Sequence, residues 1–325
     1  MHKSDIIQTI RSMRSDTTHG WPDATKRRAP HKPFLLLSVI DGVEQGWIRN
    51  HKITLCQPLI DAFSLYWDTV MGERQTTIAH PYFYMKSSLF WKLRYKSGVS
   101  VIQGTPSVAR LRNKISHAEI DRTLFAMMAD RHDREILRRL IISEFFSSET
   151  GSHIQEIREF GRSSFDYASS LDELLKSPFE IDHTKDEGNV YQTVNQQVRD
   201  RGFSMKVRMA YDYTCAVCRG KVITPEGRTL VDGAHILPLN TTNNNDPRNG
   251  LALCKTHHWM FDHYMLTVRP DYRLQLSDWL RLEDNNAEET LRWADSEILL
   301  PAESGFFPAG LALQDHNKRF QEAQI

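Results

Sequence analysis

The sequence predicts an α+β fold in two domains: a helix-rich N-terminal domain with a small sheet, and a C-terminal domain built around clustered cysteines and histidines. Three observations predict it. The 325 residues exceed the usual size of one domain. Apolar residues recur at helical spacing on either side of an aromatic, β-prone stretch in the first half of the chain. Three of the four cysteines lie between residues 215 and 254.

We expect the N-terminal domain at 1–147, a linker at 148–190 and the C-terminal domain at 191–325. The middle segment is polar, turn-rich and acidic, which is typical of a linker carrying a helical turn or two. The aromatic stretch at 76–103 predicts two or three strands, with a bend at His80-Pro81. The spacing of apolar residues predicts helices at 5–15, 33–46, 58–71, 117–128, 132–146, 191–213, 289–299 and 313–323.

The composition is that of an ordinary globular protein, with 40% hydrophobic and 25% charged residues. No apolar run reaches the ~18 residues that suggest a membrane span. The N-terminus is polar, so we expect no signal peptide and a cytoplasmic protein. The 41 basic residues balance 41 acidic ones, and this total neither supports nor excludes nucleic acid as a partner. Local basic clusters do occur at 26–32 and 92–96.

Four residues of the C-terminal domain have the types and spacings of zinc ligands. Cys215 and Cys218 are separated by two residues, and so are Cys254 and His257. Three thiolates and one imidazole close a tetrahedral structural zinc site. Cysteines clustered in this way favour a metal over a disulfide scaffold. We therefore expect zinc to supply much of the stability of this small domain.

His257 and His258 compete for the fourth position. Adjacent residues on a helix point about 100° apart, so one can face the zinc and the other a second site. The spacing from Cys254 favours His257 as the zinc ligand. His258 is then available for chemistry, together with His235 and Asn249.

Three short motifs surround these residues. They read AHI at 234–236, NGLALC at 249–254 and HWMFD at 258–262. This pattern resembles the HNH endonuclease family, a ββα-metal fold, and in particular its branch with A-H-I, N-G-L-x-L-C and H-x-x-F-D. The resemblance implies phosphodiester hydrolysis at a single divalent cation such as Mg²⁺ or Mn²⁺, with His235, Asn249 and His258 as catalytic residues.

Hydrolysis of a phosphodiester needs a nucleophilic water, stabilised charge and help for the leaving oxygen. An imidazole that titrates near neutral pH can take the proton of the water, and His235 fits this role. We expect His258 to hold the cation. Asn249 either fixes the loop between the strands or orients His235 through a hydrogen bond.

Many members of the family carry an acidic metal ligand immediately before the base histidine, where this chain has Ala234. Asp232 is the first candidate to replace it, and we expect Asp232 to share the strand face of His235. Asp262 is the second candidate, because it follows His258 by four residues on the same helix face. A local cap or ion pair would equally explain Asp262.

Two motifs of the N-terminal domain, KRRAPHKPFLLL at 26–37 and HPYFYMKSSLFWKL at 80–93, carry a second resemblance. Over about residues 20–147 the chain resembles the sulfur-binding domain of phosphorothioate-dependent, McrA-like type IV restriction endonucleases, which place this domain before an HNH domain. Sulfur is less hydrated than oxygen, so an apolar niche at Pro81 would accept it at lower cost. The family commonly has Tyr before this proline and a small residue three positions after it, whereas this chain has His80 and Tyr84.

The resemblance places Arg28 and His31 against DNA near the sulfur, and nearby basic residues are expected at phosphates. The expected residues of this DNA- and sulfur-binding site are Arg27, Arg28, His31, Lys32, His80, Pro81, Tyr84, Lys86, Arg110 and Arg112.

The sequence thus favours a modification-dependent endonuclease that recognises phosphorothioated double-stranded DNA. One alternative is an HNH restriction nuclease that reads methylated or unmodified sequence. Another, from a different class, is a non-catalytic, zinc-stabilised DNA-binding protein, against which the intact His235, Asn249 and His258 argue. One HNH site cuts one strand, so we expect a homodimer.

Overall fold

The computed structural model describes residues 1–181, 190–242, 244–282 and 287–324. The chain divides into two compact units, which are residues 1–162 with 223–228, and residues 163–222 with 229–325. Each unit has its own apolar core. Within the described ranges, no helix combines the length and the apolar character needed to cross a membrane.

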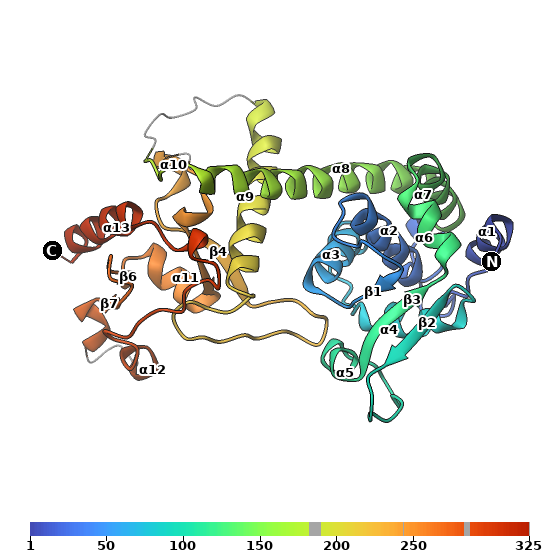
Figure 1. The fold of residues 1–325 in the computed structure, drawn as a ribbon, viewed down its shortest axis with the longest axis horizontal. Helices are drawn as coiled ribbons and strands as arrows, with labels where there is room; N and C mark the ends of the chain where they lie inside the picture. The colour runs from blue at the N-terminus through green and yellow to red at the C-terminus, as the bar shows by residue number, and fades with distance from the viewer. Residues whose placement is uncertain (182–189, 243, 283–286, 325) are drawn as a thin grey trace. The chain divides into compact units, whose positions relative to one another are not determined.

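The first unit is organised around helix α2 (Figure 1), whose side chains from Pro33 to Gly42 are all buried. This burial follows from its sequence, since FLLLSVI is apolar on every side. Helices α3, α4, α6 and α7 pack against α2, and α1 packs against α6 and α7. The helices of this unit are α1 (Lys3–Arg11), α2 (His31–Glu44), α3 (Gln57–Met71), α4 (Ala79–Tyr84), α5 (Val108–Lys114), α6 (Arg122–Ala129) and α7 (Arg131–Phe145).

A three-stranded antiparallel sheet completes the first unit. Its order is β1 (Lys52–Ile53), β3 (Ile115–Ile120), β2 (Trp91–Tyr95), with Leu93 opposite Ala118. The sheet corrects two expectations. The expected helix at 117–128 begins as strand β3, whose side chains alternate in burial, and becomes helical only at Arg122. The expected strand at 99–103 is not regular structure.

The expected strand at 76–85 is wrong as well, because this segment forms α4 and a short 3₁₀ turn. Ile78, Ala79, Tyr82 and Phe83 are all buried, and their spacing of three and four residues is that of a helix. The aromatic composition concealed this period. Pro81 is tolerated because it lies in the first turn, where its missing N–H leaves no intrahelical bond unmade.

The polar segment after α7 is helical too, which corrects the expected linker. Helix α8 (Ser148–Ser170) has 23 residues, followed by a 3₁₀ turn at Leu171–Lys176. Its buried positions are Gly151, Ile154, Ile157, Ser164 and Ala168. They recur every three to seven residues along one face, but three of them are small, so the sequence shows little apolar contrast.

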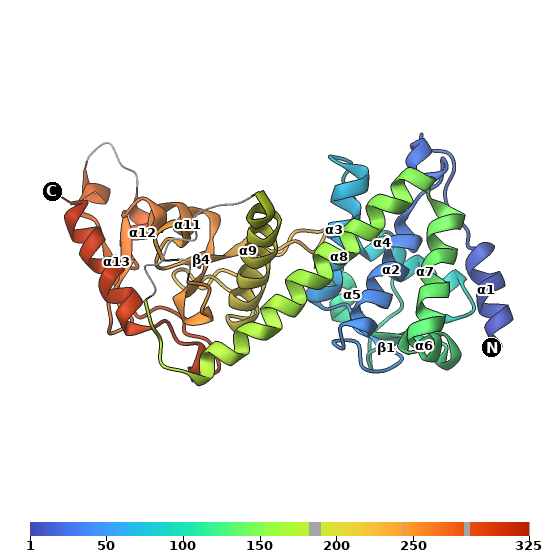
Figure 2. The same ribbon diagram turned by 90° about the horizontal axis from the view of Figure 1, so that it is seen from above.

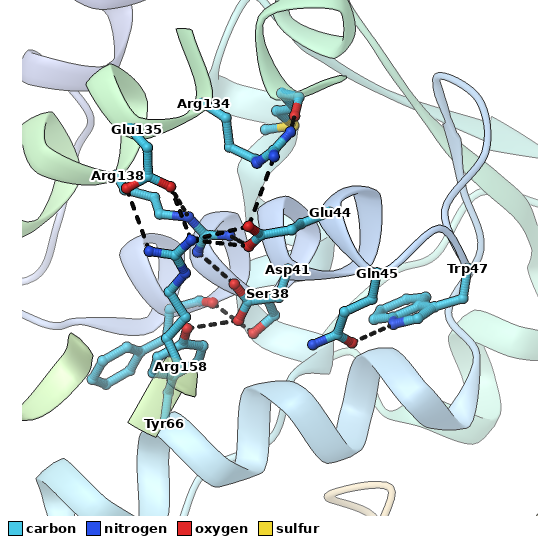
Figure 3. Close-up of polar contacts among 12 residues, drawn as sticks. Ser38, Asp41, Glu44, Gln45, Trp47, Tyr66, Arg134, Glu135, Arg138 and Arg158 are labelled. Carbon is cyan, nitrogen blue, oxygen red and sulfur yellow. Dashed lines mark hydrogen bonds and ion pairs between the residues drawn. The ribbon is translucent and has the colours of Figure 1, made fainter. Parts of the chain in front are cut away.

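A buried charge cluster joins α2, α7 and α8 in the first unit (Figure 3). Arg138 contacts Asp41 and Glu44 at 2.5 Å each, and its side chain is 3% exposed. Arg158 contacts Glu44 at 3.0 Å and Glu135 at 2.9 Å. The Tyr66 hydroxyl also donates to Asp41 at 2.6 Å. The carboxylates and guanidinium groups therefore neutralise one another inside the core.

In the second unit, helix α9 lies along strand β4 in both views (Figures 1 and 2). Strands β4 and β5 pair antiparallel, strands β6 and β7 form a second pair, and α13 covers β6. The elements are α9 (Val190–Ala210), β4 (Val231–His235), α10 (Leu239–Thr242), β5 (Gly250–Cys254), α11 (Lys255–Asp262), β6 (Leu266–Val268), β7 (Leu274–Leu276), α12 (Glu288–Leu291) and α13 (Gly310–Glu322).

The structure confirms most of the expected helices, with shifted ends. Those expected at 5–15, 33–46, 58–71, 132–146, 191–213 and 313–323 correspond to α1, α2, α3, α7, α9 and α13. The helix expected at 289–299 is wrong beyond its first turn, because α12 ends at Leu291. After it, Ser296 donates its hydroxyl to the Trp293 carbonyl, and Arg273 bridges to Glu297 as in a strand pair.

Candidate active site

The site is built on a ββα unit formed by β4, β5 and α11. Strand β4 ends at His235, which is opposite Gly250 at the start of β5, and β5 runs directly into α11 at Cys254. Gly250 is required by close approach, since a Cβ there would lie 2.4 Å from the Val207 side chain and 3.0 Å from Phe203 of α9. Helix α9 can therefore lie against the strand pair next to His235.

The four expected zinc ligands meet at one point. The ligand atoms of Cys215, Cys218, Cys254 and His257 all lie within 4.8 Å of one another. His257 Nδ1 is 3.1 Å from the Cys254 sulfur and 3.6 Å from the Cys215 sulfur. Ligands held about 2.0–2.3 Å from a tetrahedral zinc ion would be separated by similar distances. This donor set fits zinc and could hold it.

Local backbone geometry brings these ligands together. After Cys218, Arg219 adopts a left-handed conformation with φ 55°, and the Gly220 carbonyl then accepts from the Cys215 N–H at 3.0 Å. Cys254 is the N-cap of α11, which places His257 in the first turn beside it. A hydrogen bond from the Cys215 thiol lowers the pKa of Cys254 to about 3, with help from His257. One thiolate is therefore favoured by the protein itself.

His235 and Asp232 lie on opposite faces of β4, which corrects the expectation that they share one. The His235 ring stacks on Phe203 of α9, with centroids 3.7 Å apart and planes 7° from parallel. Asp232 instead contacts Lys255 and His258 of α11. The physical reason is the period of two in a strand: residues three apart point to opposite sides. Asp232 thus shares the face of Ala234, the position where many HNH sites carry their acidic ligand.

His258 lies between the two candidate carboxylates. Its Nδ1 is 3.8 Å from Asp232 and its Nε2 is 3.5 Å from Asp262. The two carboxylates therefore approach opposite nitrogens of one ring. In this arrangement a single cation could be held by Asp232 with Nδ1 or by Asp262 with Nε2, but not by all three residues together.

The two histidines have pKa values displaced in opposite directions. Burial lowers the pKa of His235 to about 4, so its ring is neutral at neutral pH. A hydrogen bond to Asp232 raises the pKa of His258, with further support from Asp262. Partial burial opposes ionisation of Asp232, but hydrogen bonds from His258 and Lys255 lower its pKa to about 2. The result is a neutral imidazole near a carboxylate pair that attracts cations.

Asn249 is completely buried and holds the loop between β4 and β5. Its side-chain oxygen accepts from the Leu237 N–H at 2.9 Å. Its amide group donates to the carbonyls of Leu237 at 3.2 Å and Asn244 at 2.9 Å. None of these hydrogen bonds goes to His235. The hydrogen-bond partner of His235 is Asn245, at 2.9 Å, which the sequence reasoning missed because Asn245 lies between the motifs in a run of asparagines.

The first unit contains a cavity of about 230 Å³ that gathers half of the expected DNA- and sulfur-binding residues. His31, Lys32, His80, Pro81 and Tyr84 line it, and the sequence reasoning missed its other lining residues. Burial lowers the pKa of His31 to about 4, with His80 and Arg74 as further causes. Burial likewise lowers the pKa of His80 and of Lys32. The missed lining residues are Arg14, Ser15, Asp16, Trp21 and Ala29.

The other five expected residues lie outside this cavity and have partners within the chain. Arg27 pairs with Asp23, Arg28 donates to the Glu144 carbonyl, and Lys86 lies 3.7 Å from the centre of the Phe83 ring. Arg110 donates to the carbonyls of Gln103 and Thr105, and Arg112 to that of Leu55. Each of the five side chains therefore has a partner within the chain, and their role at DNA stays a prediction.

Comparison with known proteins bears on the ββα region of the second unit. Among solved structures, a chain described as "Modification dependent TagI restriction endonuclease" aligns at 20% identity, with a TM-score of 0.28, over 36% of this chain and 36% of that chain. The alignment thus spans about a third of that protein. No curated protein matches the sequence. Residues 215–269 match the sequence model described as HNH endonuclease. This stretch, which holds the Cys/His cluster, His235 and His258, is an HNH endonuclease domain.

Proposed function

We propose that the protein is a modification-dependent DNA endonuclease that recognises phosphorothioated DNA through its first unit and hydrolyses phosphodiester bonds at the ββα site. The observation that carries the nuclease part is the contrast between the two histidines of one small site. His235 is neutral and held in place, whereas His258 lies between two carboxylates that favour a cation. His235 thus fits the role of the general base, and His258 with its two carboxylates fits that of the cation site.

In the proposed mechanism, His235 accepts the proton of the attacking water. Burial lowers its pKa to about 4, below the near-neutral value expected from the sequence, so the ring is in the accepting form across the physiological range but is a weaker base than expected. His258 would hold the divalent cation together with Asp232 or Asp262. The bound cation would stabilise charge on the phosphate and on the leaving oxygen. Asn249 fixes the loop between the strands. Zinc held by Cys215, Cys218, Cys254 and His257 would fix β5 and α11 in their relative positions.

Cleavage by the His235→Ala variant tests the nuclease proposal. We expect cleavage to fall by about 10²–10⁴-fold, the usual contribution of a general base, with DNA binding retained. His153, an exposed histidine of α8, provides the matched control, and His153→Ala should cut like the unmodified protein. Unchanged cleavage by His235→Ala would refute the assignment of the base.

The lining of the cavity in the first unit supports the phosphorothioate specificity. Trp21, Ala29, Pro81 and Tyr84 supply apolar surface, while Arg14 and Lys32 add positive charge at the same cavity. A phosphate oxygen would lose hydration against the apolar wall, and the more weakly hydrated sulfur would lose less. The cationic groups would attract the backbone without distinguishing the two.

Matched duplexes with and without one phosphorothioate test this specificity. We expect on the order of 10-fold tighter binding of the modified duplex, because one methylene-sized apolar contact discriminates by about 10–200-fold. Tyr84→Ala should reduce the preference, and Leu89→Ala, at a residue 76% exposed and outside the cavity, should not. Equal affinity for both duplexes would refute sulfur recognition and leave the nuclease proposal intact. Equal affinity for these two duplexes, combined with tighter binding of methylated duplexes, would favour the alternative of an HNH restriction nuclease that reads methylated sequence.

A further inference from the structure

Asn245 approaches the ring of His235 from the loop between β4 and β5. Its side-chain oxygen is 2.9 Å from His235 Nε2, and the residue is 4% exposed. The three HNH motifs leave it out, since they cover 234–236, 249–254 and 258–262. The contact nevertheless reaches the proposed base directly.

Two contacts fix the His235 ring. Stacking on Phe203, at 3.7 Å between centroids and 7° between planes, sets the plane of the ring. The hydrogen bond to Asn245 sets its rotation within that plane. An amide oxygen can only accept, so Nε2 must carry the proton. In the neutral ring the lone pair is then on Nδ1, and the structure gives Nδ1 no hydrogen-bond partner among the described residues.

We propose that Asn245 is the positioning residue of this site: it holds His235 as the tautomer protonated on Nε2, so that Nδ1 takes the proton of the attacking water. The proposal rests on the proposed function, in which His235 is the base. It also gives Asn249 an indirect role at His235, through the loop that carries Asn245. The Asn249 amide holds the carbonyl of Asn244 at 2.9 Å, and the residue after Asn244 contacts His235.

The rest of the loop is fixed around Asn245. The Asn244 side-chain oxygen accepts from the Asp246 N–H at 2.9 Å, and the Asp246 carbonyl accepts from the Asn249 N–H at 2.8 Å. Asp246 also caps the turn that begins at Pro247, accepting from the Arg248 N–H. The Asn245 side chain is therefore presented to His235 by a backbone that is hydrogen-bonded on both sides.

The chemistry of Asn245 itself points to a role beyond packing. Its amide nitrogen is buried and has no hydrogen-bond partner in the described part of the chain. Burying an unsatisfied polar group is destabilising, a cost that leucine, of similar size, would avoid. The hydrogen bond to His235 is what an apolar residue cannot provide.

Two substitutions separate positioning from packing. Asn245→Leu keeps the volume and removes the acceptor, whereas Asn245→Asp keeps an acceptor at the same place. With Leu, we expect kcat to fall by about 10²–10⁴-fold, the cost of losing a correctly prepared base, with KM for DNA unchanged. With Asp, we expect kcat within about 10-fold of the unmodified protein. Asn113→Leu, at an exposed asparagine of α5 in the first unit, is the control.

The tautomer is read independently of cleavage by ¹⁵N NMR of histidine-labelled protein, with the His235 signal assigned from His235→Gln. We expect Nε2–H in the unmodified protein, in Asn245→Asp and in Asn113→Leu, and a rise in Nδ1–H in Asn245→Leu. Equal zinc content and circular dichroism confirm that the variants are folded. Nδ1–H in the unmodified protein, or an unaltered tautomer in Asn245→Leu, would overturn the proposal. If His235→Ala still cuts DNA while Asn245→Leu shifts the tautomer, positioning is supported and the proposed base is refuted.

Discussion

The two charge clusters of the molecule differ in their access to solvent. In the first unit Arg138 is 3% exposed, and its partners Asp41 and Glu44 are 9% and 14% exposed. In the second unit Asp232, His258 and Asp262 are 34%, 28% and 55% exposed. The first cluster is closed, because its charges already neutralise one another in the core. The second is more exposed, and in this sense open, so a cation can compete with Lys255 for Asp232 and can reach Asp262.

Ion pairs alone therefore do not identify a functional site. Both clusters displace pKa values, since burial raises the pKa of Asp41 in one and hydrogen bonds lower that of Asp232 in the other. What distinguishes them is the room left for a further partner. In a closed cluster the loss of one charge leaves its partner buried and unpaired, whereas an open cluster gains stability from what binds to it.

The largest expected effect comes from removing zinc. Structural zinc contributes on the order of 10 kcal/mol in small domains, so the second unit should unfold locally while the first unit remains folded. Hydrogen exchange with mass spectrometry after chelation should show lost protection at β5 and α11 and retained protection at α2. Cys56→Ser, outside the cluster, should bind zinc normally. Full protection in zinc-free protein would contradict this dependence on the metal.

The next effect concerns the closed cluster. Arg138→Met leaves Asp41 buried without its charge partner, and we expect a loss of about 3–5 kcal/mol in the free energy of unfolding of the first unit. Urea denaturation measures it. Lys3→Met removes the ion pair to Asp133 from an exposed side chain and should cost less than about 1 kcal/mol. Similar losses in the two variants would show that the cluster is not closed to water.

The open cluster should respond in the opposite way. Asp232→Asn should leave stability nearly unchanged and weaken Mn²⁺-dependent cleavage by about 10–100-fold, the scale of losing an acidic group at a metal site. Asp262→Asn is the matched change at the other nitrogen of His258. The variant with the larger rise in the Mn²⁺ concentration needed for half-maximal cleavage identifies the side that holds the cation. Unaltered Mn²⁺ dependence in both would exclude this cluster as the cation site.

The smallest effect concerns a buried histidine in the first unit. The pKa of His31 is about 4 in the folded protein, against about 6.5 in an unfolded chain. Because the unfolded chain then binds the extra proton, its contribution to stability is complete above pH 6.5 and is lost as pH falls toward 4. His31→Gln should flatten the pH dependence of the first unit's unfolding between pH 7 and 5, and exposed His153→Gln should not. An identical slope in His31→Gln would contradict the low pKa.

The sequence alone determined the features that depend on local spacing. The Cys/His cluster was predictable because two short spacings, Cys215–Cys218 and Cys254–His257, each place two donors in one turn. The amphipathic α7 was equally readable, since its strong period of three and four residues leaves little choice of structure. The apolar run of α2 was readable from its length and from the proline near its start. The HNH motifs belong to the same class of signal.

Only the tertiary structure decided which residues of different elements meet. The helical period of α4 was hidden by β-prone aromatics, and that of α8 by small residues that are buried only because neighbouring helices cover them. Nothing in the order of residues placed Phe203 under His235 or Asn245 against its Nε2. These contacts join an α-helix, a strand and a loop, and their geometry is set by the packing of the whole unit, which local spacing does not encode.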